Sequence, residues 1–388
     1  MSYKHDSMNT IAATRARDLG LPFDGTPGQW NAITDVPGVE VGFTTLVEGK
    51  DELQPGKGPI CTGVTAILPR GISANPKPVW AGLFNLNGNG ELTGSHWIQD
   101  AGYFLSPICI TNTHSVGIAH HATVGWMIDQ YDDYFTNYHS WAMPVIAETY
   151  DGAVSDICGR HVTEQHVLDA LNSAIPGPVL EGNVGGGTGM QTYEFKGGTG
   201  TSSRSIDIVG QQYTVAALVQ SNFGVRHELN ILGVPVGKHM TDNAFISETS
   251  GHEQGSIIVI IATDAPLLPI QLQRLAKRGA IGIGRTGTSG GHFSGDIMLA
   301  FSTGNKLDMP PLGAQQPRSF NLECINDAHC DIIYEAAVQA VEESVINAMV
   351  AAKSVPVIKP PGYILTAIDH DDLRKLMIKY NRSLPRSH

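Results

Sequence analysis

The feature that most constrains the fold of this chain is an apolar run that begins at Ser256. The run Ser-Ile-Ile-Val-Ile-Ile-Ala-Thr-Asp covers residues 256–264 and directly follows Gly255. Five consecutive branched aliphatic residues are typical of a strand that is buried on both faces. The sequence therefore predicts a central strand with a layer packed against each side, and a serine hydroxyl rigidly mounted at its first position.

The Gly255-Ser256 dipeptide has two interpretations. Gly-Ser commonly ends a loop, and for the dipeptide alone this is the more frequent role. Alternatively, cleavage of the bond between the two residues gives Ser256 a free α-amine. Such an amine has a pKa of about 7.7–8.0, so near neutral pH it serves as the base that a weak hydroxyl nucleophile needs. The second interpretation predicts a self-processing N-terminal-nucleophile hydrolase.

Further strands and helices are expected along the 388 residues. Apolar runs predict strands at 63–68, 107–111, 144–149, 212–220, 256–262 and 297–301. Apolar residues at helical spacing predict helices at 95–104, 122–131, 161–173, 266–279, 328–353 and 368–380. Residues 30–42, around a Pro-Gly pair, are expected to form strand, turn and strand. This mixture favours a layered α/β arrangement with helices covering sheets.

Composition excludes several classes of partner. The formal net charge is −12 and lysine and arginine do not cluster, which argues against nucleic acid. No apolar run reaches about 18 residues, so no membrane-spanning helix is expected. The first twenty residues lack the apolar stretch of a secretory signal, which predicts a cytoplasmic protein and leaves a periplasmic location open. The five cysteines lack Cys-x-x-Cys spacing, so we expect free thiols.

Other motifs suggest chemistry only weakly. The glycine-dense segment 182–204 lacks the P-loop pattern and a clean dinucleotide fingerprint, and we expect its backbone to be shaped around a ligand. Residues 287–289 (Gly-Thr-Ser) resemble the nucleophile turn of subtilisin-type proteases but lack the partner motifs. Cys324, His329 and Cys330 are a weak candidate for a metal site, because their spacing is unlike that of structural zinc sites.

Nine separated motifs match one family when they are taken together and in order. They are WNAITDVPGV (30–39), LNGNGE (86–91), ETYDG (148–152), GNVGGGTGM (182–190), GTSSR (200–204), QSNFG (220–224), GSIIV (255–259), ATDAPL (262–267) and HFSGD (292–296). With them the chain resembles the family of the L-aminopeptidase/D-amidase/esterase and the β-peptidyl aminopeptidases, over about residues 15–375.

The resemblance implies a self-cleaved catalytic domain. Ser256 matches the nucleophile that is released by cleavage after Gly255, which divides the single domain 1–388 into chains 1–255 and 256–388. Ser294 matches a second serine that contacts the nucleophile. Asp296 stands where the family pattern has glutamate, so its hydrogen-bond partner is open.

The resemblance also implies residues that bind the substrate. Tyr150 and Asn222 match groups that stabilise the oxyanion, and a hydroxyl and an amide are suitable neutral donors. Glu148 matches a carboxylate that receives the free amino group of the substrate. Residues two apart on a strand face one side, so Glu148 and Tyr150 are expected to share a pocket. Asn87 and Glu91 either line this pocket or stabilise its loop.

Structural explanations stay open for several of these residues. Glu148 is also a candidate ion-pair partner of Arg204 or Arg226. Tyr150 has the alternative of an ordinary core aromatic, and Asn222 that of an ordinary turn residue. Ser294 and Asp296 have similar alternatives, as a turn serine and as a cap.

The fold and activity implied are those of the N-terminal-nucleophile hydrolases. We expect an αββα sandwich, with two central sheets covered by helices, that hydrolyses the amide or ester bond after an N-terminal amino acid through an acyl-enzyme on Ser256. The substrate is a small peptide or an amino-acid amide or ester, and no metal or organic cofactor is implied. A homo-oligomer, a tetramer of cleaved protomers, is expected. The alternatives are β-peptidyl specificity, a self-cleaving acyltransferase, which normally carries a threonine nucleophile, and a non-catalytic homologue that binds amines or peptides.

Overall fold

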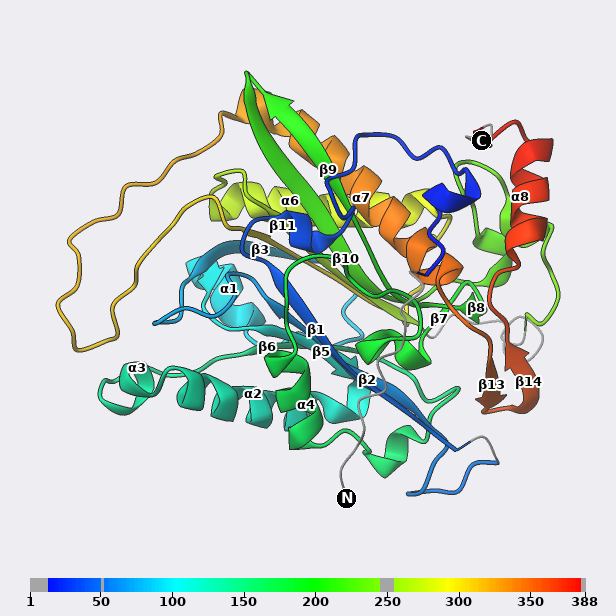
Figure 1. Ribbon diagram of the computed structural model, residues 1–388, viewed down its shortest axis with the longest axis horizontal. Helices are drawn as coiled ribbons and strands as arrows, with labels where there is room; N and C mark the ends of the chain where they lie inside the picture. Colours follow the sequence, from blue (N-terminus) through cyan, green and yellow to red (C-terminus); the bar gives the residue numbers. More distant parts are fainter. Residues whose placement is uncertain (1–12, 50–51, 245–254, 385–388) are drawn as a thin grey trace.

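Four layers make up the fold, in the order helix, sheet, sheet, helix (Figure 1). A computed structural model describes residues 13–49, 52–244 and 255–384. None of the helices within these ranges combines the length and the apolar composition needed to cross a membrane.

The larger sheet has six strands, with the strand that begins at Ser256 in its interior. In spatial order they are β4 (Tyr103–Phe104), β3 (Val79–Asn85), β12 (Gly295–Ser302), β11 (Ser256–Thr263), β10 (Gln211–Asn222) and β9 (Gly198–Ile208). Strand β11 runs parallel to β12 and antiparallel to β10. The apolar run of the sequence thus has a hydrogen-bonded neighbour on each side.

The second sheet has four strands and packs face to face with the first. In spatial order they are β1 (Glu40–Glu48), β2 (Ile60–Leu68), β5 (Ile108–Asn112) and β6 (Val145–Thr149). One buried apolar cluster joins the facing strands of the two sheets. This cluster is the core of the sandwich.

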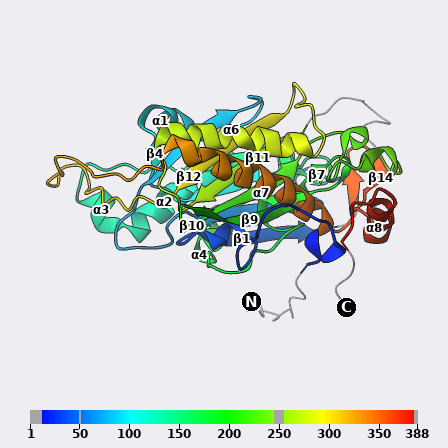
Figure 2. The same ribbon diagram turned by 90° about the horizontal axis from the view of Figure 1, so that it is seen from above.

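Helices cover the outer face of each sheet. Helices α6 (Pro269–Arg285) and α7 (Cys330–Val350) lie side by side over the six-stranded sheet (Figure 2). Helices α2 (Val116–Gln130) and α4 (Glu164–Asn172) cover the four-stranded sheet (Figure 1). The smaller elements are α1 (Ser95–Ala101), α3 (Asp132–Thr136), α8 (His370–Lys379), β7 (Gln191–Thr192), β8 (Phe195–Lys196), β13 (Val355–Ile358) and β14 (Pro361–Leu365).

The alternation of side chains along β11 explains its continuous apolar sequence. Ile257, Val259 and Ile261 belong to the core between the sheet and its helices. Ile258 and Ile260 belong to the core between the two sheets. All five are fully buried, as expected for a strand that has a layer on each face. The predicted central strand is confirmed.

The expected strands are found, but β3 and β9 were not predicted. The expected helices are also found, except that the one at 95–104 ends at Ala101: Gly102 closes it in the left-handed conformation, and Tyr103–Phe104 form strand β4.

Two further differences are instructive. Residues 30–36 do not form a strand. The carboxylate of Asp35 accepts hydrogen bonds from the backbone N–H groups of Trp30 and Ala32, at 2.9 and 3.0 Å, and the segment curls into the 3-10 helix Ile33–Asp35. Local side-chain bonds of this kind compete with extended structure.

The second difference is the end of α6, which continues six residues beyond Gly279 to Arg285. Gly279 was expected to end the helix. Instead, a Cβ at this position would lie 2.7 Å from Cγ of Met298, and a Cβ at Gly282 would lie 2.6 Å from Cβ of Val341. These glycines allow α6 to approach β12 and α7 closely.

The glycine-dense segment 182–204 packs against the protein itself. A Cβ at Gly186 would lie 2.1 Å from Oε1 of Gln220, and one at Gly200 would lie 2.0 Å from the carbonyl oxygen of Ser344 in α7. Close contacts with other segments of the protein therefore explain these glycines. The expectation that they surround a ligand is not needed to account for them.

Candidate active site

Ser256 lies at the first position of β11 and is held from both sides of the strand. Its Oγ donates a hydrogen bond to the carbonyl oxygen of Gly255 at 2.8 Å and accepts one from the backbone N–H of Gly295 at 3.1 Å. The residue is only 6 % exposed. Ser256 is two residues before Ile258, so both side chains lie on the face of β11 that meets the four-stranded sheet. The hydroxyl is therefore fixed beside the carbonyl group of Gly255.

Gly255 is required by packing. Its neighbour Ser256 pairs with Asn222 at the end of β10. A Cβ at Gly255 would lie 2.2 Å from the carbonyl oxygen of Asn222 and 2.7 Å from Cα of Phe223. No other residue fits this approach without moving β10, so the dipeptide is more than a loop ending.

Ser294 and Asp296 form a buried pair at the start of β12. The Ser294 hydroxyl donates to Oδ1 of Asp296 at 2.6 Å, and Nδ2 of Asn87 donates to Oδ2 at 3.1 Å. Burial raises the pKa of Asp296 above its ordinary value, and the donors Ser294, Asn87 and the backbone N–H of Ile257 oppose this rise. The carboxylate is thus tied to the backbone one residue beyond Ser256.

Ser294 contacts the nucleophile less directly than expected. Its hydroxyl is directed to Asp296, and the hydrogen bond to Ser256 Oγ comes from Gly295, the next residue along the chain. Ser294 nevertheless lies next to the nucleophile, because Ser256 and Gly295 are register partners in the parallel strands β11 and β12.

Asn222 is buried opposite Ser256 and its amide orientation is fixed at both ends. Its Oδ1 accepts a hydrogen bond from the backbone N–H of Gln191 at 2.9 Å, and its Nδ2 donates to the carbonyl oxygen of Tyr150 at 3.1 Å. An amide nitrogen has two N–H groups, so one remains for another acceptor. Asn222 is the last residue of β10 and not an isolated turn residue.

Tyr150 directly follows β6 and is 42 % exposed, so it is not an ordinary core aromatic. Its ring folds back over Gly152, where a Cβ would lie 2.2 Å from the Tyr150 hydroxyl oxygen. Partial burial and the carboxyl group of Asp151 raise the pKa of the phenol. The hydroxyl therefore stays protonated at neutral pH and available as a donor.

Glu148 is buried in β6, and no arginine of the described residues forms an ion pair with it. Oε1 accepts a hydrogen bond from the backbone N–H of Glu91 at 3.0 Å, and Oε2 accepts one from the hydroxyl of Thr113. Burial raises the pKa of this carboxyl group, and the two donors oppose the rise. A Cβ on Gly90 would lie 3.4 Å both from Oε1 and from Cα of Gly295, which places the carboxylate close to the start of β12, where Gly295 pairs with Ser256.

The two arginines considered as partners of Glu148 lie elsewhere. Arg204 pairs with the buried Glu343 at 2.7 Å, so it is architectural. The Arg226 guanidinium donates to backbone carbonyl groups, beginning with that of Tyr193 at 2.9 Å.

Asn87 and Glu91 shape the loop that covers the site. Nδ2 of Asn87 donates to the carbonyl oxygen of Gly291 at 3.0 Å as well as to Asp296. Glu91 contributes its backbone N–H to Glu148, while its side chain is exposed. Asn87 therefore both stabilises the loop and contacts the carboxylate.

Sequence reasoning missed polar residues that bridge the two sheets. Nε2 of Gln220 donates to the carbonyl oxygen of Thr111 at 3.0 Å and to Oγ1 of Thr149 at 2.7 Å. Gln220 lies two residues before Asn222, on the same face of β10. A polar residue at an inward position of an otherwise apolar strand was the available signal.

Asp151 is a second missed residue, directly after Tyr150. It is fully buried, and burial raises its pKa from 3.8 to about 6. Nδ2 of Asn112 donates to Oδ2 at 3.0 Å, and the Thr62 hydroxyl also contributes. Within the described part of the chain, Asp151 Oδ1 and Asn112 Oδ1 are both buried without a hydrogen-bond partner. A buried carboxylate oxygen without a donor favours the protonated acid.

No metal site is found in the described ranges, where no three His, Cys, Asp or Glu residues gather closely enough to hold an ion. The sulfur atoms of Cys324 and Cys330 instead lie 3.3 and 3.8 Å from Oε1 and Nε2 of Gln271. The five thiols are free, as expected.

Comparisons of sequence with known proteins agree with this geometry. The model of peptidase family S58 matches residues 31–360. The chain is 47 % identical over 380 residues to β-peptidyl aminopeptidase BapA of Sphingosinicella microcystinivorans, an alignment that covers 95 % of this chain and 93 % of that relative.

Solved structures show the same likeness. The L-aminopeptidase D-Ala-esterase/amidase from Ochrobactrum anthropi, described as a prototype for the serine aminopeptidases and a variant of the Ntn hydrolase fold, superposes with a TM-score of 0.90 at 52 % identity, covering 95 % of this chain and 99 % of the other. A β-aminopeptidase from Burkholderia sp. gives 0.84 at 43 % identity, covering 94 % and 99 %. The predicted α/β sandwich of the N-terminal-nucleophile type is confirmed.

The buried Asp151 predicts a pH dependence of stability. Its pKa is raised on folding, so its protonated form stabilises the native state below pH about 4, and this contribution is lost as the pH rises through about 6. The difference between 3.8 and about 6 corresponds to about 3 kcal/mol. We expect Asp151→Asn to remove this loss of stability with rising pH. The measurement is the thermal midpoint at pH steps from 4 to about 7.

The matched control is Asp207→Asn, which changes an exposed aspartate at the end of β9. It should leave the pH dependence of the midpoint unchanged. Identical curves for wild type and Asp151→Asn would show that the buried acid does not titrate in this range.

Proposed function

The chain belongs to peptidase family S58, and on this premise we propose that Ser256 is its nucleophile and that the chain cleaves itself before Ser256. The chain is an aminopeptidase, a hydrolase that acts on peptide bonds. The observation that carries the proposal is the position of the Ser256 hydroxyl, at the first residue of a buried strand and 2.8 Å from the Gly255 carbonyl oxygen.

The cleavage step follows from this arrangement. Oγ of Ser256 attacks the carbonyl carbon of Gly255, and the C–N bond between the two residues breaks. The proton of the hydroxyl passes to the departing nitrogen, which becomes the α-amine of Ser256. Water then hydrolyses the resulting ester and releases the carboxyl group of Gly255, leaving chains 1–255 and 256–388.

The new α-amine serves as the base during turnover. It takes the proton of the Ser256 hydroxyl as Oγ attacks the substrate carbonyl, and returns a proton to the departing amine. Water hydrolyses the acyl-enzyme with the same base. The buried Asp296, which Ser294 and Asn87 hold near the backbone of residues 256–257, stabilises the protonated amine.

Neutral donors and one carboxylate complete the site. The hydroxyl of Tyr150 and the remaining N–H of Asn222 donate to the oxyanion, and the loss of one such donor typically lowers the rate by about 10²–10³. Glu148 receives the free ammonium group of the substrate. Its burial strengthens this interaction, because charges attract more strongly where water is excluded.

The shared catalytic residues do not determine which class of aminoacyl group the enzyme prefers. The relatives carry different substrate names, β-peptidyl aminopeptidase and L-aminopeptidase D-Ala-esterase/amidase. A pocket separates substrates that differ by one methylene by only about 1–3 kcal/mol, and through shape rather than through the shared catalytic residues. Hydrolysis of L-, D- and β-aminoacyl amides by one preparation identifies the preferred class.

The nucleophile is tested by Ser256→Ala. We expect one intact mass in place of two chains, and a loss of aminoacyl-amide hydrolysis of about 10⁴-fold or more, because the hydroxyl and the base are lost together. The control is Ser289→Ala, which removes the exposed hydroxyl of the Gly-Thr-Ser turn at 287–289 and should leave both measurements unchanged. Full activity of Ser256→Ala would disprove the mechanism. A wild-type chain that stays intact and inactive would indicate a protein that only binds amines or peptides.

The role of Asp296 is tested by Asn87→Ala. Nδ2 of Asn87 stabilises the charged form of the carboxylate, so its removal raises the pKa of Asp296 further. We expect the acidic limb of the kcat/KM–pH profile to move to higher pH, since the ionised carboxylate is then lost earlier on acidification.

The matched control is Asn89→Ala. Nδ2 of Asn89 donates to the carbonyl oxygen of Phe293 at 2.7 Å, in the same turn that Asn87 holds through Gly291, but not to Asp296. If both variants move the acidic limb equally, the loop and not the carboxylate determines it.

We also infer that the protomers assemble as a homo-oligomer, a tetramer by family resemblance. Support comes from the long segment between β12 and α7, which extends away from the layers (Figure 1) and exposes more than a third of Leu312, Phe320 and Leu322. Exposed apolar side chains on one such segment favour a protein contact. Light scattering should give a multiple of 41.5 kDa, and the mass of one protomer would contradict the inference.

A further inference from the structure

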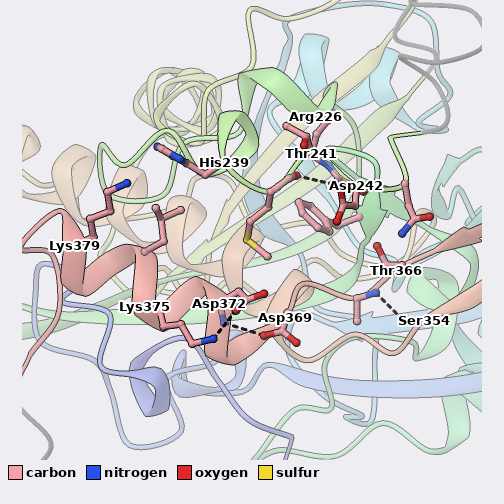
Figure 3. Close-up of a pocket in the computed structure, with 15 residues that line it drawn as sticks. Arg226, His239, Thr241, Asp242, Ser354, Thr366, Asp369, Asp372, Lys375 and Lys379 are labelled. Carbon is pink, nitrogen blue, oxygen red and sulfur yellow. Dashed lines mark hydrogen bonds and ion pairs between the residues drawn. The ribbon is translucent and has the colours of Figure 1, made fainter.

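Arg226 is a buried cation whose side chain binds backbone carbonyl groups. It is 3 % exposed, and its guanidinium lies 3.4 Å above the ring of Phe195. Its nitrogen atoms donate to four backbone carbonyl groups, those of Tyr193 at 2.9 Å, Glu194 at 2.6 Å, Met240 at 2.8 Å and Asp242 at 2.9 Å. Figure 3 shows Arg226 beside Thr241 and Asp242, across a cavity from the lysines of α8. The side chain thus joins two separate segments.

One of these segments is the turn between β7 and β8, which has an unfavourable backbone conformation. Tyr193 and Glu194 both have positive φ angles, 52° and 60°. Residues with side chains adopt this region rarely, and persist there only when their surroundings fix them. The carbonyl groups of the same two residues accept the hydrogen bonds of Arg226, and Oε1 of Glu194 accepts its backbone N–H at 2.8 Å. Arg226 therefore holds the turn in place.

The β7–β8 turn, once it is held in place, orients the amide of Asn222. Strand β7 begins at Gln191, and the N–H of Gln191 donates to Oδ1 of Asn222 at 2.9 Å. This contact determines which end of the amide is oxygen, and so directs Nδ2 to the other side, where it meets the carbonyl oxygen of Tyr150. A shift of β7 removes the constraint on the amide.

We propose that Arg226 is a positioning residue of the active site, which fixes the β7–β8 turn and through it the amide of Asn222 as an oxyanion donor. This inference rests on the proposed function, because it requires Asn222 to act on the oxyanion. Arginine suits the role, since its planar group presents five donors in a rigid fork, whereas lysine presents three donors from one point.

The test is a double-mutant cycle with Arg226→Lys and Asn222→Ala, measured as kcat and KM per cleaved protomer, with cleavage counted by intact mass. Asn222→Ala should lower kcat by about 10²–10³. Arg226→Lys should lower kcat by about tenfold to a hundredfold with little change in KM, the scale of a misplaced catalytic group. In the Asn222→Ala background, Arg226→Lys should have no further effect on kcat. Residues that act as independent structural supports would instead give multiplied effects.

Arg70→Lys is the matched control. Arg70 also donates to three backbone carbonyl groups, those of Pro78, Thr303 and Asn305, at 2.9, 3.1 and 2.6 Å. Thr303 follows β12 at the end opposite to Ser294. We expect Arg70→Lys to lower the thermal midpoint and leave kcat unchanged.

The outcomes separate the two proposals. Wild-type kcat in Asn222→Ala would disprove the oxyanion role of Asn222, and this inference with it. If Asn222→Ala lowers kcat and the double variant shows the product of the two single losses of kcat, only the inference about Arg226 is overturned. It is also overturned if Arg226→Lys folds but stays uncleaved, or if Arg226→Lys and Arg226→Gln both fail to fold while Arg70→Lys folds, because Arg226 then serves cleavage or stability instead.

Discussion

The burial of β11 on both faces is the constraint on which the rest of the structure depends. A strand with no exposed face needs a hydrogen-bonded neighbour on each side and a layer above and below it. Strands β10 and β12 are the hydrogen-bonded neighbours of β11. The four-stranded sheet covers one face of β11, and helices α6 and α7 cover the other. The end of such a strand is the only part that can meet a substrate. The rigidity of the nucleophile is thus a consequence of packing and not of a dedicated loop.

The polar groups near Ser256 follow from the same constraint. At this end the interior between the sheets changes from aliphatic to polar, and a buried polar group is stable only when it is hydrogen-bonded. The Nε2 group of Gln220 meets this condition by joining β10 to the second sheet, and the amide of Asn222 meets it at both ends through the backbone of Gln191 and Tyr150. The bonds that satisfy these groups also orient them. Stability and orientation of the site therefore have one physical origin.

Sequence patterns predicted the layers well and the local geometry less well. Apolar runs predicted β2, β5, β6, β10, β11 and β12 because burial determines them, but they did not predict β3 or the glycine-rich β9. The ordered motifs placed Ser256, Asn222 and Glu148 in one region. The curl at 30–36 was missed because it depends on the side chain of Asp35, and the glycines at 182–204 were assigned to a ligand because their close contacts come from distant segments. Arg226 was considered only as a partner for Glu148. Its actual partners are backbone carbonyl groups, which no sequence pattern reveals.

The shorter carboxylate at position 296 illustrates how local chemistry adjusts to the fold. Aspartate is one methylene shorter than glutamate, so its reach from β12 is smaller. Ser294 nevertheless donates to it at 2.6 Å, because residues two apart at the start of the strand bring the two side chains to one face. Asn87 reaches the second oxygen from the covering loop at 3.1 Å. The position of the negative charge is therefore determined by its donors, Ser294 and Asn87, as well as by the length of its own side chain.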